Sequence, residues 1–341
     1  MTWSDPDVET LQPGVHRLPL PLPQDALKAV NVYVLEDGEG LTLIDSGWHG
    51  EHSHLALSSG LAQLGFGIGD VDRVLVTHLH GDHVGQAATL RERAGARIWL
   101  GEHERSALEV ALRGNAAQDA DRDAHVKRLG AARLLAELHA MPPIAPYQWE
   151  LPDRWLSDAD EVVVGGTVLS SLATPGHTRG HVSFADADRK LLFAGDHVLP
   201  HITPSIGFEN APQRTALADF LGSLARVRDL DIDLVLPAHG PVFTDLPGRV
   251  DELAAHHDRR LHDTLGIAVA GARTAYDVAE QLPWTRRGRA FTSLGVFDRM
   301  LAAWETAAHL ELLVARGELA RLDGEVVEYV SVPSPLEPAW A

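Results

Sequence analysis

The chain has 341 residues, which is enough for one large domain and a smaller one. Its hydrophobic content of 45% and charged content of 23% are ordinary for a globular protein and argue against disorder. The formal net charge of -19 disfavours nucleic acids and anionic membrane surfaces as partners, and the absence of cysteine excludes disulfides and thiolate metal sites.

The N-terminal third alternates short β-type runs with turns. A β-branched run at 30–35 and a shorter run at 41–44 flank an acidic, glycine-containing turn, which is typical of a hairpin. A helical stretch at 54–64 precedes a short apolar run at 71–76, and a helix over 84–94 and a strand over 97–100 follow. This order predicts an α/β layered domain.

The middle of the chain interrupts this alternation and then resumes it. Residues 104–138 show helical spacing and precede a proline-rich stretch, so we interpret about 104–147 as a helical insertion over the edge of the sheet. A strand–turn–strand pattern at 162–174, a strand at 190–194, a helix at 216–228 and a strand at 234–237 follow. We place the first domain at residues 1–250.

The remaining residues, 251–341, have a different pattern. Helices are expected at 250–266, from Thr274 as N-cap, and at 297–316, and a hairpin is expected around Asp323 and Gly324. Helices followed by a hairpin predict a small winged-helix-like module. Residues 258–328 hold 9 Arg and 11 acidic residues, a net of -2 (9 minus 11), which is not typical of nucleic-acid binding. We expect the module to close a pocket or to support a homodimer.

A cluster of histidines follows the apolar run at 71–76. The segment 77–85 reads THLHGDHVG, and a loop after a strand of an open α/β sheet can direct its side chains into one cavity. His78 and His80 can face one metal ion, and Asp82 and His83 can face a second. The alternative is a polar loop whose histidines are simply solvated.

Further ligand-type residues make that alternative weak. His177 lies in TPGHTRGH, Asp196 in LLFAGDH and His239 in LVLPAHGP, and each follows a short apolar run. Several strand-end loops that converge on one site are more specific than a single motif. The sequence therefore predicts a metal site built from nitrogen and oxygen ligands.

These motifs together resemble the signature of the metallo-β-lactamase superfamily over about residues 15–245, and Asp45 in LIDSG matches its first motif. The resemblance implies an αββα sandwich with two divalent ions at one edge. It assigns one ion to His78, His80 and His177. It assigns the other to Asp82, His83 and His239, with Asp196 bridging the two. Asp45 would orient a ligand or the loop.

The chemistry implied is hydrolysis. Two close divalent ions share a hydroxide at neutral pH, which attacks an electrophilic carbonyl or phosphorus while the second ion stabilises the oxyanion. Asp82 or a water could protonate the leaving group, so Asp82 and Asp196 are the candidate catalytic residues. We expect Zn²⁺, with Fe²⁺ or Mn²⁺ as alternatives.

The substrate class is inferred from the resemblance and from the start of the chain. Asp196 and the absence of a visible signal peptide or membrane span make the chain more similar to glyoxalase II, lactonase and β-lactamase-like groups, and we expect a cytoplasmic protein. A small thioester, ester or lactone is the expected substrate. The alternative is a phosphodiesterase or endoribonuclease, because the C-terminal module and GDHVLPHITPSI resemble a subgroup with an RNA-cleaving member. A di-iron redox enzyme is a third class, disfavoured because no flavin domain is visible.

Other candidates have an ordinary structural alternative. Trp48 is a possible pocket wall or a packed side chain, and His201 stands where a basic residue is expected and could line the pocket or cap a loop. His181 and His197 neighbour ligands, and a supporting role is expected for them. Two further groups could face substrate or its anionic tail, or could be solvated turns: Tyr147 with Trp149, and Arg286 with Arg287 and Arg289.

Overall fold

The structure of the protein, a computed structural model, describes residues 3–23, 27–38, 40–142, 148–209, 212–285 and 288–332. Three of the residues that the sequence suggests as substrate contacts, Tyr147, Arg286 and Arg287, lie outside the described residues.

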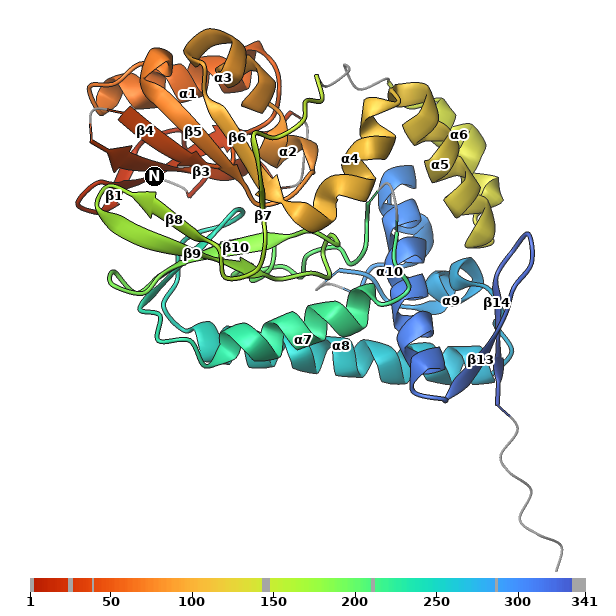
Figure 1. Ribbon diagram of the computed structural model, residues 1–341. Coiled ribbons are helices and arrows are strands. Elements are labelled where there is room, and N and C mark those ends of the chain that lie inside the picture. The colour runs from red at the N-terminus through yellow and green to blue at the C-terminus, as the bar shows by residue number, and fades with distance from the viewer. Residues whose placement is uncertain are drawn as a thin grey trace, which may run out of the picture.

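A seven-stranded sheet forms the first half of the molecule (Figure 1). Its strands, in spatial and chain order, are β1 (Glu9–Gln12), β2 (Val15–Pro21), β3 (Ala29–Asp37), β4 (Gly40–Ile44), β5 (Val71–Val76), β6 (Arg97–Gly101) and β7 (Arg154–Leu156). The pairs from β1 to β4 are antiparallel and those from β4 to β7 are parallel. Parallel pairing brings the carboxyl ends of β4 and β5 to the same edge.

A five-stranded sheet faces the first. Its spatial order is β12 (Leu234–Pro237), β11 (Leu191–Gly195), β10 (Val182–Asp186), β9 (Thr167–Ala173) and β8 (Glu161–Val164). Strand β10 is antiparallel to both β9 and β11, and β12 is parallel to β11. Strands β9, β11 and β12 therefore run in the same direction and end at one edge.

Helices cover the outer faces of both sheets. Figure 1 shows α1 (Glu51–Gln63) and α3 (Ala87–Ala94) over the first sheet, and α7 (Ala216–Arg228) and α8 (Leu246–Val269) under the second. One apolar cluster fills the space between the sheets, including Tyr33 and Phe193, whose rings meet edge to face at 5.3 Å. This arrangement confirms the predicted αββα sandwich.

The remaining helices are short or belong to the C-terminal part. They are α2 (Gly81–Val84), α4 (Arg105–Leu112), α5 (Asn115–Arg128), α6 (Leu135–His139), α9 (Ala275–Gln281) and α10 (Val296–Ala315), with 3₁₀ turns at Ile68–Asp70, Glu102–Glu104, Ala132–Leu134 and Phe291–Ser293. Strands β13 (Leu319–Leu322) and β14 (Glu328–Ser331) form the expected hairpin. Thr274 caps α9 as predicted, because its hydroxyl accepts a hydrogen bond from Asp277 N–H.

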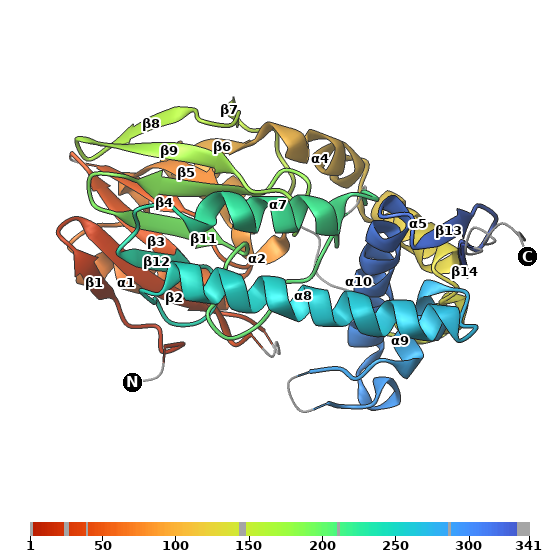
Figure 2. The ribbon, with the colours of Figure 1, turned by 90° about the horizontal axis from the view of Figure 1, so that it is seen from below.

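The C-terminal helices are continuous with the sandwich. Helix α8 runs through the predicted boundary at residue 250, and Figure 2 shows it lying beside α7 and extending toward α10. One apolar cluster contains Leu192 of the second sheet, Phe220 of α7 and Leu310 of α10. The division at 250 stays a prediction, but these residues share one core.

The insertion packs on the C-terminal module rather than only along the sheet edge. Tyr276 N–H donates to Leu129 O at 3.0 Å, and Val327 N–H donates to Arg128 O at 2.9 Å. The insertion and the module thus form one body at the end of the sandwich that Figure 1 shows away from the N-terminus.

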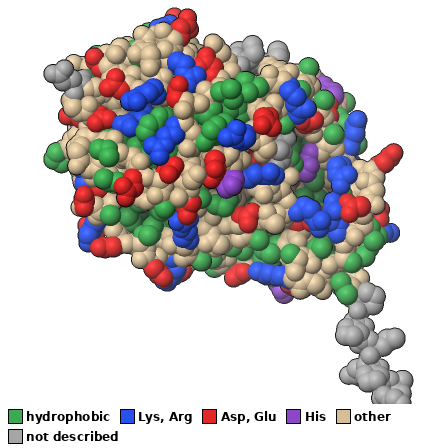
Figure 3. Space-filling model, in the orientation of Figure 1, with side chains coloured by type: hydrophobic (Ala, Val, Ile, Leu, Met, Phe, Trp, Pro, Cys, Tyr) green, Lys and Arg blue, Asp and Glu red, His purple; other side chains and the backbone are tan. Residues whose placement is uncertain are grey.

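The surface has mixed charge, and acidic and basic side chains are interspersed on the face shown in Figure 3. Among the described residues, none of the helices is both long and apolar enough to cross a membrane.

Candidate metal centre

The predicted ligands lie at the edge where the strands of both sheets end. His78 follows β5 after one residue, Asp196 follows β11 directly, and His239 lies two residues beyond β12. Gly195 has φ +53, and a Cβ there would lie 2.5 Å from His181 Nε2. Glycine therefore lets the chain turn sharply and present Asp196 to the site.

Three histidines meet with their ring nitrogens closer than neutral rings without a shared proton would choose. His177 Nε2 lies 3.1 Å from His78 Nε2 and 3.0 Å from His80 Nδ1. His177 Nδ1 donates to Ser205 O at 2.6 Å, and His80 Nε2 donates to Phe208 O at 2.6 Å. Since a neutral imidazole has one N–H, the two atoms that face each other both carry lone pairs.

His78 completes this three-histidine group. Its Nδ1 lies 3.0 Å from Thr77 Oγ1, which itself donates to Asp45 and so accepts from His78. Three lone pairs therefore converge with no proton between them, which is the arrangement that a cation stabilises.

A second group consists of Asp82, His83 and His239, and its members all lie within reach of one ion. His239 Nε2 is 3.2 Å from Asp82 Oδ2, and His83 Nε2 is 3.6 Å from Asp82 Oδ1. His239 Nδ1 donates to Ala29 O at 2.9 Å, which directs its Nε2 lone pair into the site. We call this the Asp82 group.

Asp196 lies between the two groups. Its Oδ2 is 3.5 Å from His177 Nε2 and 3.7 Å from His83 Nε2, and its Oδ1 is 3.4 Å from His239 Nε2. The structure therefore brings together all seven residues that the sequence predicts as ligands: His78, His80, Asp82, His83, His177, Asp196 and His239.

The two groups differ in electrostatics. Burial lowers the pKa of His177 to about 3, with repulsion from His80 as the next cause, so its imidazole is neutral. Burial also lowers the pKa of His83, but the charges of Asp82, Asp45 and Asp196 outweigh it and raise that pKa to about 10. Neutral rings and a strongly negative field are both features of a site that attracts cations.

The donor set fits zinc. Ligands at about 2.0–2.1 Å from a tetrahedral Zn²⁺ lie about 3.3–3.4 Å from one another. The distances in both groups cluster around this value. Within the described part of the chain, buried His83 Nε2, His239 Nε2 and Asp196 Oδ1 have no hydrogen-bond partner, so these atoms are available to bind an ion.

Asp45 holds this site from behind, as the sequence predicts. It is buried, its Oδ2 accepts from His83 Nδ1 at 2.7 Å, and its Oδ1 accepts from Thr77 N–H at 2.8 Å. Its φ of +61 is uncommon for a residue other than glycine. This conformation turns the carboxylate back under the loop that carries the histidines.

Several supporting groups leave no recognisable signal in the sequence. The carbonyls of Ala29, Ser205 and Phe208 orient three ligands, and a carbonyl is available at any residue. His181 Nε2 accepts from Asp196 N–H at 3.0 Å, which is the supporting role expected for it. His197 is fully buried, and burial lowers its pKa to about 4.

Glu104 is a further buried carboxyl beside the site. It is 0% exposed, Thr178 Oγ1 donates to it at 2.5 Å, and it also accepts from the backbone of Leu79 and Gly180. It therefore connects the loop of His78 and His80 to the loop of His177. Burial raises its pKa to about 8, and the nearby Glu209 adds to the shift.

We expect Glu104→Gln to change how stability depends on pH. A carboxyl whose pKa rises from 4.5 to about 8 on folding stabilises the protein fully below the lower value and loses that contribution as pH rises to 8. The wild-type free energy of unfolding should fall by a few kcal/mol over this window relative to the variant, since one unit corresponds to about 1.4 kcal/mol.

Urea unfolding at pH 5 and pH 8 measures this difference. Glu161→Gln, on the exposed face of β8, serves as the control and should follow the wild type. Identical pH slopes for the wild type and Glu104→Gln would show that Glu104 titrates normally.

The weaker candidates fall outside the two groups. Trp48 and Trp149 both pack against the apolar core of the first sheet, and His201 is exposed. Arg289 hydrogen-bonds Ser293 within its own turn at 3.2 Å. Nothing in these positions selects a substrate role over ordinary structure.

Another cluster of possible ligands, His256, His257 and Glu305, lies between α8 and α10. His257 Nδ1 is hydrogen-bonded to His309 Nε2 at 3.1 Å, and the charge of Arg260 is among the causes that lower the pKa of His257, after burial. A fixed guanidinium charge disfavours a divalent cation here, so we assign this cluster to helix packing.

Comparison with known proteins agrees with this geometry. The family model for the metallo-beta-lactamase superfamily matches residues 26–239. A crystal structure of a metallo-beta-lactamase family protein from Thermus thermophilus is 30% identical, with a TM-score of 0.78, and the match covers 95% of this chain and 100% of that one.

Curated relatives are more distant. Beta-lactamase-like protein 2 homolog of Caenorhabditis elegans is 27% identical over 267 residues, covering 76% of this chain and 74% of the relative. Atrochrysone carboxyl ACP thioesterase of Aspergillus fumigatus is 26% identical over 247 residues, covering 71% of this chain but only 46% of the relative. The family match, the sandwich and the histidine–aspartate site together show that the chain belongs to the metallo-beta-lactamase superfamily and is a metal-dependent hydrolase.

Proposed function

We propose that this protein hydrolyses a thioester, ester or lactone at a pair of Zn²⁺ ions held by the three-histidine group and the Asp82 group. The observation that carries the proposal is the convergence of unshared lone pairs, with His177 Nε2 at 3.0 Å from His80 Nδ1. When bound, two such ions supply a hydroxide at neutral pH and stabilise negative charge on a substrate oxygen.

Asp196 has the central position in this proposal. It is 3.4–3.7 Å from ring nitrogens of both groups, so its two oxygens can serve both ions. Burial raises its pKa, but His239, His83 and His177 outweigh that effect and lower it, so the carboxylate is ionised. Its backbone N–H, donated to His181, holds its orientation.

Asp82 is the group best placed to move a proton. Its side chain is 16% exposed, whereas the neighbouring His83 and His239 side chains are 0% and 2% exposed. It therefore reaches both the ligands and the approach to the site. We propose that it donates to the leaving group as the acyl bond breaks.

A carbonyl substrate is favoured over a phosphodiester for two reasons. One relative is named a thioesterase, and the net charge of -19 opposes a polyanion. The acyl group and leaving group are set by residues of the insertion and C-terminal module, which stand beside the site.

The test is an assay on purified, metal-quantified protein with a panel of acyl thioesters, esters and lactones, in parallel with a single-stranded RNA oligonucleotide. We expect turnover of carbonyl substrates only, lost with a chelator and regained with Zn²⁺. Chelator-sensitive RNA cleavage without acyl hydrolysis would overturn the substrate class in favour of a phosphodiesterase. Iron-dependent redox activity without hydrolysis would overturn the reaction type.

A further inference from the structure

We propose that Trp304, on helix α10 of the C-terminal module, is a positioning residue that holds the three-histidine group in its metal-binding geometry. This inference rests on the metal site proposed above. It assigns the module a part in assembling the site.

The connection runs through the segment 205–208. Ser205 O and Phe208 O accept the ring N–H groups of His177 and His80 at 2.6 Å each. These two carbonyls decide which nitrogen of each ring carries the lone pair. The position of this segment therefore controls two of the three ligands.

Trp304 fixes the middle of that segment. Its indole Nε1 donates to Gly207 O at 2.7 Å in a buried hydrogen bond, and its ring meets Phe208 edge to face at 5.3 Å. Gly207 N–H in turn donates to Gly176 O at 2.9 Å and His177 O at 3.1 Å. Gly207 is thus held on one side by the loop of His177 and on the other by α10.

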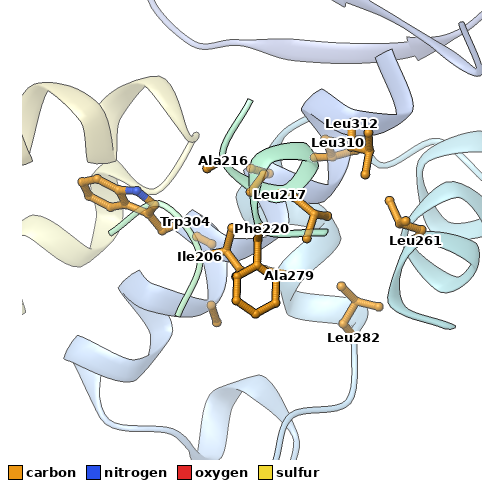
Figure 4. Packing of buried hydrophobic residues seen from close by; sticks show 14 of the residues in the cluster. Ile206, Ala216, Leu217, Phe220, Leu261, Ala279, Leu282, Trp304, Leu310 and Leu312 are labelled. Atoms are coloured by element: carbon orange, nitrogen blue, oxygen red, sulfur yellow. The ribbon is translucent and has the colours of Figure 1, made fainter. Parts of the chain in front are cut away.

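Trp304 is itself held firmly. It is 5% exposed, and its ring lies 4.0 Å from the His125 ring of α5, measured between centroids. Figure 4 shows it in the same packed cluster as Ile206, which belongs to the segment. The insertion, the module and the ligand-supporting segment meet at this one indole.

The site offers a contrast that tests the inference. The hydrogen-bond and ring partners of Trp304 described above lie outside the Asp82 group, whose histidines are oriented by Asp45 and Ala29. Loss of the indole N–H should therefore weaken zinc at the three-histidine group and leave the Asp82 group unchanged. Trp304→Phe removes the donor and keeps an aromatic ring.

Trp284 is a matched control in the same module. Its Nε1 also donates to a backbone carbonyl, Ala279 O at 2.9 Å, but that carbonyl supports no ligand among the described residues. Trp284→Phe removes an equivalent bond without touching the segment.

Zinc affinity is measured by competition with a chromophoric chelator in two backgrounds. His239→Ala removes a ligand of the Asp82 group, and His80→Ala removes a ligand of the three-histidine group. We expect Trp304→Phe to weaken zinc binding about tenfold in the first background, at the low end of the effect of outer partners of metal ligands. It should stay within about twofold in the second background, as should Trp284→Phe in both.

Hydrogen exchange of metal-free protein gives a second readout. Amides of residues 205–209 should exchange faster in Trp304→Phe and not in Trp284→Phe. Equal zinc affinities for the two variants, or equal losses in both backgrounds, would overturn the inference while two bound zinc ions in the wild type still support the proposed function. A wild type that binds no divalent metal would overturn both.

Discussion

Asp196→Asn is expected to lower kcat about 1000-fold or more, the scale of losing the main stabilisation of charge in a transition state. The substitution keeps the shape of the side chain and removes the charge that faces His177, His83 and His239. Metal content measured on the purified variant should fall from two ions toward one, while its circular dichroism stays that of the wild type.

Asp186→Asn is the control for this experiment. Asp186 is also a buried aspartate at a strand end of the second sheet, where it accepts from Thr167 Oγ1 at 3.1 Å, but it lies outside both groups. It should retain metal and turnover. Full activity of Asp196→Asn with two ions bound would rule out the bridging role of Asp196.

Asp45→Asn should weaken metal binding about 10- to 100-fold with a correctly folded chain. An amide nitrogen in place of Oδ2 would face the donor His83 Nδ1, which now lies 2.7 Å from the carboxylate. His83 would then have to move its proton to Nε2, the atom that faces Asp82 and Asp196. Asparagine tolerates the φ of +61 at this position, so the effect is on the ligand rather than on the backbone.

Asp45→Ala should be more severe, because it also leaves buried donors of Thr77 and His83 unpaired, at about 1–3 kcal/mol each. Isothermal titration with Zn²⁺ and urea unfolding separate the two effects. Asp37→Asn, which alters another multiply bonded aspartate whose Oδ2 accepts from Arg73 at 2.7 Å, should lower stability without changing zinc affinity. Unchanged zinc affinity in Asp45→Asn would show that Asp45 does not select the form of His83.

The sequence allowed the ligands to be predicted because metal chemistry restricts them to a few side chains at strand ends. Asp196 and His239 each follow an apolar run, and the runs at 71–76 and 234–237 are strands β5 and β12 with the same bounds. The carbonyls of Ser205 and Phe208 could not be predicted, since their role depends on where the backbone passes. Glu104, at the start of a helical stretch, has the sequence appearance of a surface residue.

Some of the fold was missed for similar physical reasons. Strand β2 contains Pro19 and Pro21, which cannot donate to a ladder and so weaken the signal of a strand in the middle of a sheet. Strand β10 is short and includes Ser183 and Asp186, although both are buried in the structure. The predicted helix at 84–94 is instead α2 followed by α3, and α2 carries Asp82 and His83.

Helix α8 also bears on how chains of this kind can diversify. Because it begins under the sandwich and continues without a break past residue 250, there is no linker at which the C-terminal part could be exchanged as a cassette. A replacement module would have to supply a new partner for Phe220 and a new donor for Gly207 O at once. Specificity in this chain is therefore open to gradual substitution within the module, and closed to recombination at its boundary.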